Sequence, residues 1–281
     1  MNLRTIRKKI KSVTNVKKIT KAMQLVSAIK MKKAQQVAID GRPYQTEIEN
    51  IIRAVSPKID PSLSPLISQP EDKIEKKNLA IVMASNKGLC GSFNFNLFRF
   101  IVKNIDFKNT DFVIIGKKAN LLSKFSAHIM ADYSSNVPIN NVSALFEFIL
   151  NKYLDKTYKQ VDLFHNQFIS TIQSNPTITT LLPINFSQKT ETDKYEYLIE
   201  PHPKQIIDSL LKSFVEEKIR FALIQSEAGE HSLRMMAMKN ATDNATDVIY
   251  NLTMVRNKIR QEKITSELLD MITAKESVEA V

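Results

Sequence analysis

The strongest candidate for chemistry in this chain is the turn from Ser85 to Gly91, which follows an apolar run of strand length. A strand that leads through a glycine-containing loop into a helix is where α/β folds bind phosphate. This turn reads SNKGLCG, however, and has neither the GxGxxG nor the GxxxxGK[ST] pattern of a nucleotide site. We interpret it as a tight turn that passes close to a long helix, with phosphate binding as the alternative.

Metal, redox and hydrolytic sites have no better support. The histidines show neither HxxH nor HExxH spacing, and they are His128, His165, His202 and His231. Cys90 is the single cysteine, so no intramolecular disulfide can form, which fits a reducing compartment. No Ser/His/Asp arrangement or carboxylate pair stands out, and we expect no catalytic residue, no cofactor and no metal.

Positive charge is concentrated in the first part of the chain. Residues 1–39 contain eleven Lys and Arg and no Asp or Glu, which equals the net charge of +11, whereas the remainder carries 29 charges of each sign. Such a segment indicates an acidic partner, which can be nucleic acid, anionic lipid or protein. Residues 1–43 contain no aromatic residue, so base-stacking platforms are missing. The lysines of this acid-free face are Lys8, Lys9, Lys11, Lys17, Lys18 and Lys21.

The sequence gives no indication of export or of a membrane span. Its beginning lacks the roughly 7–15 consecutive apolar residues of a secretory signal, and it is poorer in Arg and Ser than a mitochondrial presequence. No run approaches the roughly 18 apolar residues of a membrane-spanning helix. We expect a soluble chain that associates with a membrane only through partners.

The element that must position any site is a long C-terminal helix. Lys204 to Ala274 contains no proline and a single glycine, Gly229, which predicts a helix on the order of 100 Å long. Apolar residues recur three and four apart and predict a coiled-coil seam at Met238, Ala241, Ala245, Val248, Leu252, Val255 and Ile259. The alternative is one helix of a large bundle.

The predicted partner is the N-terminal helix. Its seam has the same spacing and comprises Leu3, Ile6, Ile10, Val13, Val16, Ile19, Met23, Val26 and Ile29. Pro43 is expected to end or kink this helix, with a helical pattern resuming from Tyr44 to Val55. Antiparallel pairing predicts that residue numbers across the seam add to about 260.

The longer helix should then extend beyond its partner from Arg260 to Glu276, by roughly 15 residues. This overhang carries an apolar cluster without an intramolecular partner, which consists of Leu268, Leu269, Met271 and Ile272.

The middle of the chain predicts an inserted Rossmann-like α/β domain, so the fold class is α/β with a long antiparallel coiled coil of the terminal helices. The predicted boundaries are 1–56 for the N-terminal shaft helix, 57–77 for a linker, 78–200 for the α/β domain and 201–281 for the C-terminal shaft helix. Expected strands are Leu79–Ala84, Asp111–Gly116, Ala127–Ala131, Gln160–Ser170 and Thr177–Asn185, with Tyr195–Ile199 as an optional last strand. Expected helices are Asn94–Asn104, Lys117–Phe125 and Val142–Tyr158. Strands that alternate with helices predict a largely parallel sheet, here with an antiparallel pair at its late edge.

Several segments resemble one family across the whole length. They are NVKKITKAM at Asn15–Met23, SAIKM at Ser27–Met31, GLCGSFN at Gly88–Asn94 and YLIEP at Tyr197–Pro201. Further similar positions in the tail are Arg234-Met235, Ala237–Lys239, Ala241–Ala245, Asn257-Lys258, Arg260-Gln261, Ile264-Thr265 and Glu267-Leu268. These segments resemble the gamma subunit, the central rotor shaft, of F-type ATP synthases.

The resemblance implies a non-catalytic subunit that rotates inside a hexamer of alpha and beta subunits and couples proton flow to ATP synthesis or hydrolysis. It also implies contact with the epsilon subunit and the membrane c-ring, no nucleic acid, and a peripheral location on the cytoplasmic face of a bacterial inner membrane. The competing hypotheses are a basic coiled-coil protein that binds nucleic acid and a nucleotide-dependent α/β enzyme.

The resemblance further implies particular site residues. The expected contacts to the catalytic subunits are Met23, Arg234, Arg260, Gln261 and Thr265, and Glu200 is the expected coupling residue near the foot. Alternatively, Met23 packs in the helix seam, and Arg234 and Arg260 are solvated.

Overall fold

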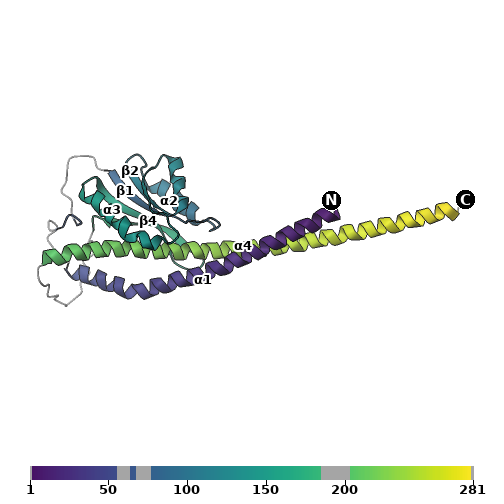
Figure 1. Ribbon diagram of the computed structural model, residues 1–281, viewed down its shortest axis with the longest axis horizontal. Helices are drawn as coiled ribbons and strands as arrows, with labels where there is room; N and C mark the ends of the chain where they lie inside the picture. The colour runs from purple at the N-terminus through teal and green to yellow at the C-terminus, as the bar shows by residue number, and fades with distance from the viewer. Residues whose placement is uncertain (1, 56–63, 68–76, 185–202, 280–281) are drawn as a thin grey trace. The chain divides into compact units, whose positions relative to one another are not determined.

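The computed structural model describes residues 2–55, 64–67, 77–184 and 203–279. Two long helices, α1 (Leu3–Val55) and α4 (Pro203–Glu279), stand before and after a five-stranded sheet in the chain (Figure 1). Contacts between residues divide the chain into two compact units. One unit consists of residues 1–27 and 235–281, and the other of residues 28–234. Most of the predicted linker 57–77 and the optional strand Tyr195–Ile199 lie outside the described residues, so the predicted domain boundaries stay predictions.

The sheet lies in the unit formed by residues 28–234. Its strands are β1 (Lys77–Met83), β2 (Thr110–Ile115), β3 (His128–Asp132), β4 (Tyr158–Phe168) and β5 (Ser174–Leu182). The spatial order is β3-β2-β1-β4-β5, with parallel pairing throughout except between β4 and β5. The predicted parallel sheet with an antiparallel pair at its late edge is therefore confirmed.

Both faces of the central strands are covered, which explains their unbroken apolar sequences. Ala80 and Val82 of β1 pack with α2 (Phe93–Asn104) and the 3₁₀ helix η3 (Lys117–Phe125). Ile81 and Met83 belong to the opposite core, which also contains residues of α3 (Val142–Leu154), α1 and α4. A second short 3₁₀ helix, η4 (Pro138–Asn141), precedes α3. The result is a layered domain whose second helical layer includes parts of both long helices.

One predicted helix end is wrong, and of two alternatives at another position one is excluded. The helix expected to run from Val142 to Tyr158 ends at Leu154, because Lys156 takes a left-handed conformation with φ 56° and the buried Tyr158 begins β4. Pro43 is expected to end or to kink the N-terminal helix; α1 does not end there but continues through Pro43 to Val55. Proline removes a single backbone donor, while Ala38 on one side and Ile48 on the other are buried and hold the helix in place.

Gly116, directly after β2, is a position where only glycine fits. Its φ is +95°, and an added Cβ would lie 2.0 Å from the carbonyl oxygen of Ala84. We expect Gly116→Ala to destabilise this unit by at least about 2–3 kcal/mol, because backbone strain and atomic overlap combine.

Gly41→Ala is the matched control. A Cβ there meets nothing within 4 Å, and alanine in a helix should stabilise by about 0.5–1 kcal/mol. Thermal unfolding followed by circular dichroism measures both; equal melting temperatures for the two variants would contradict this prediction.

The other unit is an antiparallel pair made from the beginning of α1 and the end of α4. Thr20 and Thr242 are both buried, and their hydroxyl oxygens lie 2.8 Å apart. Farther along, Arg256 lines the same surface groove as Arg7 and Thr14. The two helices therefore run antiparallel. The residue numbers of the threonine pair add to 262, which agrees with the predicted sum of about 260 and confirms the register.

The predicted seam itself needs correction. Val16, Ile19 and Val26 of α1 are exposed, as are Val248 and Val255 of α4. Ile29, in the unit of residues 28–234, is exposed as well. The other predicted seam residues are buried or half-buried: Leu3, Ile6, Ile10, Val13, Met23, Met238, Ala241, Ala245, Leu252 and Ile259.

Small hydroxyl side chains are buried together with these apolar residues. Ser27 and Thr242 are buried and donate their hydroxyls to the carbonyls of Met23 and Met238, each at 2.8 Å. Such bonds to a helix's own carbonyls satisfy the hydroxyl groups. These short side chains take up little room between the two helices, while Val16, Ile19 and Val26 of α1 are exposed.

Cysteines at Thr20 and Thr242 should form a disulfide within one molecule, because the two side chains meet across the seam. In a Cys90→Ser background we expect near-complete oxidation without change in molecular mass, read on non-reducing gels. Ile19→Cys with Asp243→Cys is the matched control, since both residues are exposed. Cross-linking only between separate molecules would contradict intramolecular pairing.

Candidate functional site

The turn between β1 and α2 is held in shape by its own polar groups. The Ser85 backbone N–H donates to Asn94 Oδ1 at 3.1 Å, and Asn94 Nδ2 donates to Ser85 Oγ at 2.7 Å. Ser85 Oγ in turn donates to the carbonyl of Lys87 at 2.9 Å. Leu89 and Gly91 take left-handed conformations, with φ 62° and 59°. These features make a compact turn that exposes Lys87 and Leu89.

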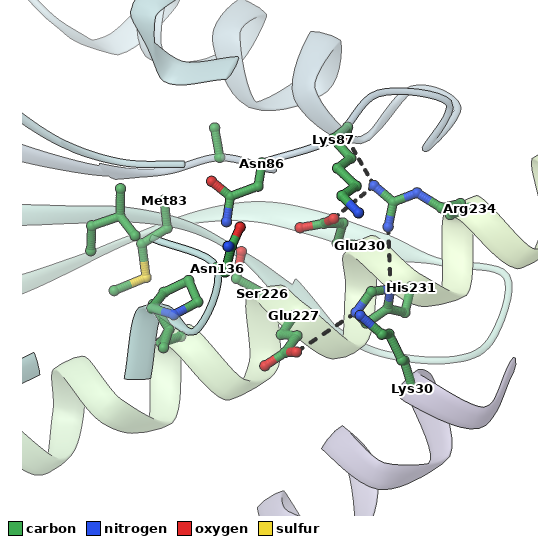
Figure 2. A pocket seen from close by; sticks show the side chains of 14 residues that line it. Lys30, Met83, Asn86, Lys87, Asn136, Ser226, Glu227, Glu230, His231 and Arg234 are labelled. Carbon is green, nitrogen blue, oxygen red and sulfur yellow. Dashed lines mark hydrogen bonds and ion pairs between the residues drawn. The ribbon is translucent and has the colours of Figure 1, made fainter. Parts of the chain in front are cut away.

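Arg234 of α4 binds this turn through its guanidinium group (Figure 2). Nε donates to the carbonyl of Gly88 at 3.2 Å, and Nη2 donates to the carbonyl of Lys87 at 2.8 Å. Nη2 also contacts Glu230 Oε1 at 2.7 Å. The turn therefore lies against the long C-terminal helix, as the sequence predicts. Arg234 is 6% exposed and is not solvated.

His231 connects Arg234 to a second acidic residue. Arg234 Nη1 lies 3.2 Å from His231 Nδ1, and because arginine only donates, Nδ1 accepts. The Nε2 atom of His231 lies 3.7 Å from Glu227 Oε1. This hydrogen-bonding histidine, together with the nearby charges of Lys30 and Lys33 on α1, keeps the pKa of Glu227 below its ordinary value against the opposing effect of burial. Glu227 is consequently charged at neutral pH.

A cavity of about 320 Å³ lies beside this network, at the carboxyl ends of β1 and β2 (Figure 2). Its charged lining consists of Lys30, Lys87, Arg234, Glu227 and Glu230. The two carboxylates compensate most of the positive charge, so the lining does not favour a polyanion such as a nucleotide. Among the residues that the structure describes, no three His, Cys, Asp or Glu side chains are grouped as a metal site.

The predicted basic face remains open on the coiled-coil unit. Five of its lysines are exposed and Lys17 is half-buried. Within the described part of the chain, none of the six forms an ion pair; Lys21 contacts only Gln24 Oε1, at 3.4 Å. The positive charge of α1 is thus available to a partner.

The overhang of α4 is fully exposed. Every side chain from Arg260 to Lys275 is exposed. The apolar cluster Leu268, Leu269, Met271 and Ile272 is more than half exposed at each position. Ion pairs between Lys258 and Glu262 and between Lys263 and Glu267, at 4.0 and 3.3 Å, support the helix along its own surface. None of the helices in the described residues is long and apolar enough to cross a membrane.

The structure brings only some of the predicted contact residues together. Gln261 and Thr265 line one shallow surface groove on the overhang, and Arg260 is exposed beside them. Met23 is half-buried in the coiled-coil unit, which fits packing in the seam. Glu200 lies outside the described residues, and Arg234 belongs to the other unit. The roles of all five as contacts stay predictions.

Glu230 and His231 are partners of Arg234 that were not predicted from the sequence. A signal was present, because Glu230 stands four residues before Arg234 and His231 three before it, which places them on one helix face.

Comparisons with known proteins extend over the whole chain. A family model described as ATP synthase matches residues 2–278. Two curated relatives are each named ATP synthase gamma chain: one from Akkermansia muciniphila is 34% identical, and one from Geobacter metallireducens is 35% identical. For both pairs the match covers 99% of each chain. In fold, the chain is similar to one in the cryo-EM structure of the Euglena gracilis mitochondrial ATP synthase, OSCP/F1/c-ring, rotational state 3, with a TM-score of 0.68, 17% identity and coverage of 99% of this chain and 95% of that one. The chain therefore belongs to the ATP synthase gamma chain family.

Proposed function

We propose that this chain is the non-catalytic central shaft of a proton-translocating F-type ATP synthase, which turns inside the catalytic hexamer. The observation that carries the proposal is the exposed overhang of α4, which extends beyond the buried pairing of α1 with α4. An unpartnered helix with an apolar cluster normally marks an interface. A hexamer with a central opening supplies such a partner, and the catalytic chemistry belongs to the hexamer.

Of the five predicted contacts to the catalytic subunits, Arg234 is buried and bonded within the chain. The contacts that we propose are the other four, Met23, Arg260, Gln261 and Thr265. Arg260, Gln261 and Thr265 are exposed and offer hydrogen bonds, and arginine can bind a carboxylate through two parallel bonds. Each such surface contact contributes about 0–1 kcal/mol. Weak contacts suit a rotor, because they must break and form again as the shaft turns past successive subunits.

The remaining partners in this proposal are the alpha and beta subunits, the epsilon subunit and the membrane c-ring. Glu200 is proposed as a coupling residue near the foot. The complex would hold the chain on the cytoplasmic face of a bacterial inner membrane, as a peripheral subunit without a nucleic-acid partner.

The test is purification of the chain from its native membrane. We expect it to co-purify with an ATP-hydrolysing hexamer, while the isolated chain hydrolyses no ATP. Recovery with nucleic acid, and sequence-specific binding to it, would instead support a basic coiled-coil protein. ATP turnover that disappears on Lys87→Ala would support an enzyme.

Charge reversal on the basic face should weaken assembly. We expect Lys8→Glu, Lys11→Glu and Lys18→Glu together to lower the affinity for the hexamer about hundredfold, because three contacts worth roughly 1 kcal/mol each are replaced by repulsion. The same change at the exposed Lys108, Lys124 and Lys159 is the matched control. Reconstitution with purified hexamer measures affinity, and circular dichroism measures helicity. Loss of helicity with unaltered assembly would contradict the prediction.

A further inference from the structure

One stretch of α4, from Gln225 to Arg234, bonds to the backbone of two separate loops of the α/β domain. Gln225 Oε1 accepts the N–H of Phe168 at 3.2 Å, and Ser232 Oγ donates to the carbonyl of Thr171. These two bonds attach the turn between β4 and β5 to α4. Arg234 ties the turn between β1 and α2 through the carbonyls of Lys87 and Gly88.

The backbone of α4 also approaches this domain closely. A Cβ at Gly229 would lie 2.7 Å from Ser174 Oγ and 3.6 Å from a ring carbon of Phe93. A Cβ at this position would overlap the Ser174 side chain at the start of β5, whereas its distance to Phe93 is an ordinary contact. The sequence thus combines a glycine that permits close approach with three polar side chains that bond to the loops.

Arg234 has almost no hydrogen-bonding capacity left for a partner subunit. A guanidinium group has five N–H donors. Nε uses its one donor on Gly88, Nη2 uses two on Lys87 and Glu230, and Nη1 uses one on His231. A single N–H remains, on a side chain that is almost completely buried. Bidentate binding of a partner's carboxylate takes two N–H groups, so at least one of these bonds would have to break.

We infer that Arg234 is a positioning residue for coupling, which fixes the turn between β1 and α2 on α4 so that the α/β domain and this helix move as one body. The inference rests on the proposed rotor function. Torque that enters through the domain can reach the shaft only if the domain does not slip on the helix. Arg234 is suited to this role because its buried side chain bonds to two backbone carbonyls of the turn.

The test compares Arg234→Ala with Arg220→Ala on the same helix. Arg220 forms ion pairs with Glu216 and Glu217 of α4, at 3.2 and 3.4 Å. Arg220→Ala is therefore a control that also removes an arginine and its ion pairs from this helix. Hydrogen exchange of the full-length chain measures the amides of residues 86–91. We expect exchange at least tenfold faster in Arg234→Ala, and no change there in Arg220→Ala or in the amides of β1 and β4 in either variant.

The second measurement uses the assembled complex in membrane vesicles. We expect fewer protons pumped per ATP hydrolysed with Arg234→Ala, at equal amounts of assembled complex. Arg234→Lys should give intermediate values in both measurements, because an ammonium group cannot span two carbonyls and a carboxylate as a guanidinium does. This variant carries the test if Arg234→Ala does not fold.

Three outcomes are decisive. Lost coupling with unchanged exchange of the turn would mean that Arg234 acts directly on another subunit, and would overturn the inference. Faster exchange with full coupling would also overturn it, since the attachment would then be unnecessary for torque. Failure of the unmodified chain to assemble with a hexamer would refute the proposed function itself, and is visible before any variant is tested.

Discussion

Arg260→Ala combined with Gln261→Ala is expected to reduce coupled ATP synthesis at least tenfold in a complex that still assembles. Both side chains are exposed, and the ion pair of Lys258 with Glu262 supports the helix of the overhang in their place. Two lost polar contacts of about 1 kcal/mol each correspond to roughly a thirtyfold loss if both form in the rate-limiting state. ATP synthesis by vesicles under an imposed proton gradient measures the effect.

Lys258→Ala with Glu262→Ala is the matched control, because it removes two polar side chains from the same stretch of helix. We expect it to leave synthesis within about twofold, since an exposed ion pair contributes little. Unchanged synthesis in the Arg260 and Gln261 variant would show that these residues are solvated. Loss of assembly would show that they hold the complex together and do not act mainly in coupling.

The central sheet was predictable because its strands are covered on both sides. The runs LAIVMA and DFVIIG contain almost no polar residue, and the structure places them in β1 and β2, next to each other. Burial on both faces requires this composition. Ends of elements were less predictable. The helix before β4 stops at Leu154 although the apolar pattern continues, because the buried Tyr158 serves the strand and not the helix.

The coiled-coil seam shows where a pattern of apolar residues misleads. Val16 and Ile19 continue the spacing of three and four, yet they are exposed while Thr20 is buried. The same spacing correctly predicts burial at Ile6, so hydrophobic spacing identifies part of the seam and misses its polar member. Threonine and serine can be buried here because their hydroxyls bond to carbonyls of their own helix. The exposed apolar residues are then available to an external partner.

Arg234 illustrates a limit of a different kind. Its position on the helix and its neighbours Glu230 and His231 can be read from the sequence. Its bonds to Lys87 and Gly88 join residues about 147 positions apart, and they depend on the path of a turn with two left-handed residues. No local sequence pattern predicts this contact between distant residues. The sequence could therefore suggest that the turn approaches a long helix, but not which side chain holds it.

Truncation after Asp270 is expected to lower the yield of assembled complex about thirtyfold or more, while rotation remains measurable in complexes that do assemble. The truncation removes Met271 and Ile272, which are 61% and 53% exposed in the isolated chain. If each buries its exposed part in an apolar collar, the loss is about 1–1.5 kcal/mol per residue, or two to three in total. The reduced yield follows from weaker association.

Rotation should survive because the paired part of the shaft is intact. The buried contacts between α1 and α4 include Thr20 with Thr242, well before the truncated end. A paired helix resists twisting better than a single one, so torque is carried mainly by the segment below Arg260. The tip then acts as an apolar bearing that centres the shaft.

Truncation after Ala274 is the matched control, because it keeps the apolar cluster and removes only the last seven residues, KESVEAV. We expect its assembly yield to be unchanged. Single-molecule rotation under ATP, at matched amounts of complex, compares both truncated chains with the full-length one. If truncation after Asp270 abolishes rotation in fully assembled complexes, the tip transmits force and does not act as a bearing. If both truncations lower assembly equally, the polar end of the helix, and not Met271 and Ile272, provides the association.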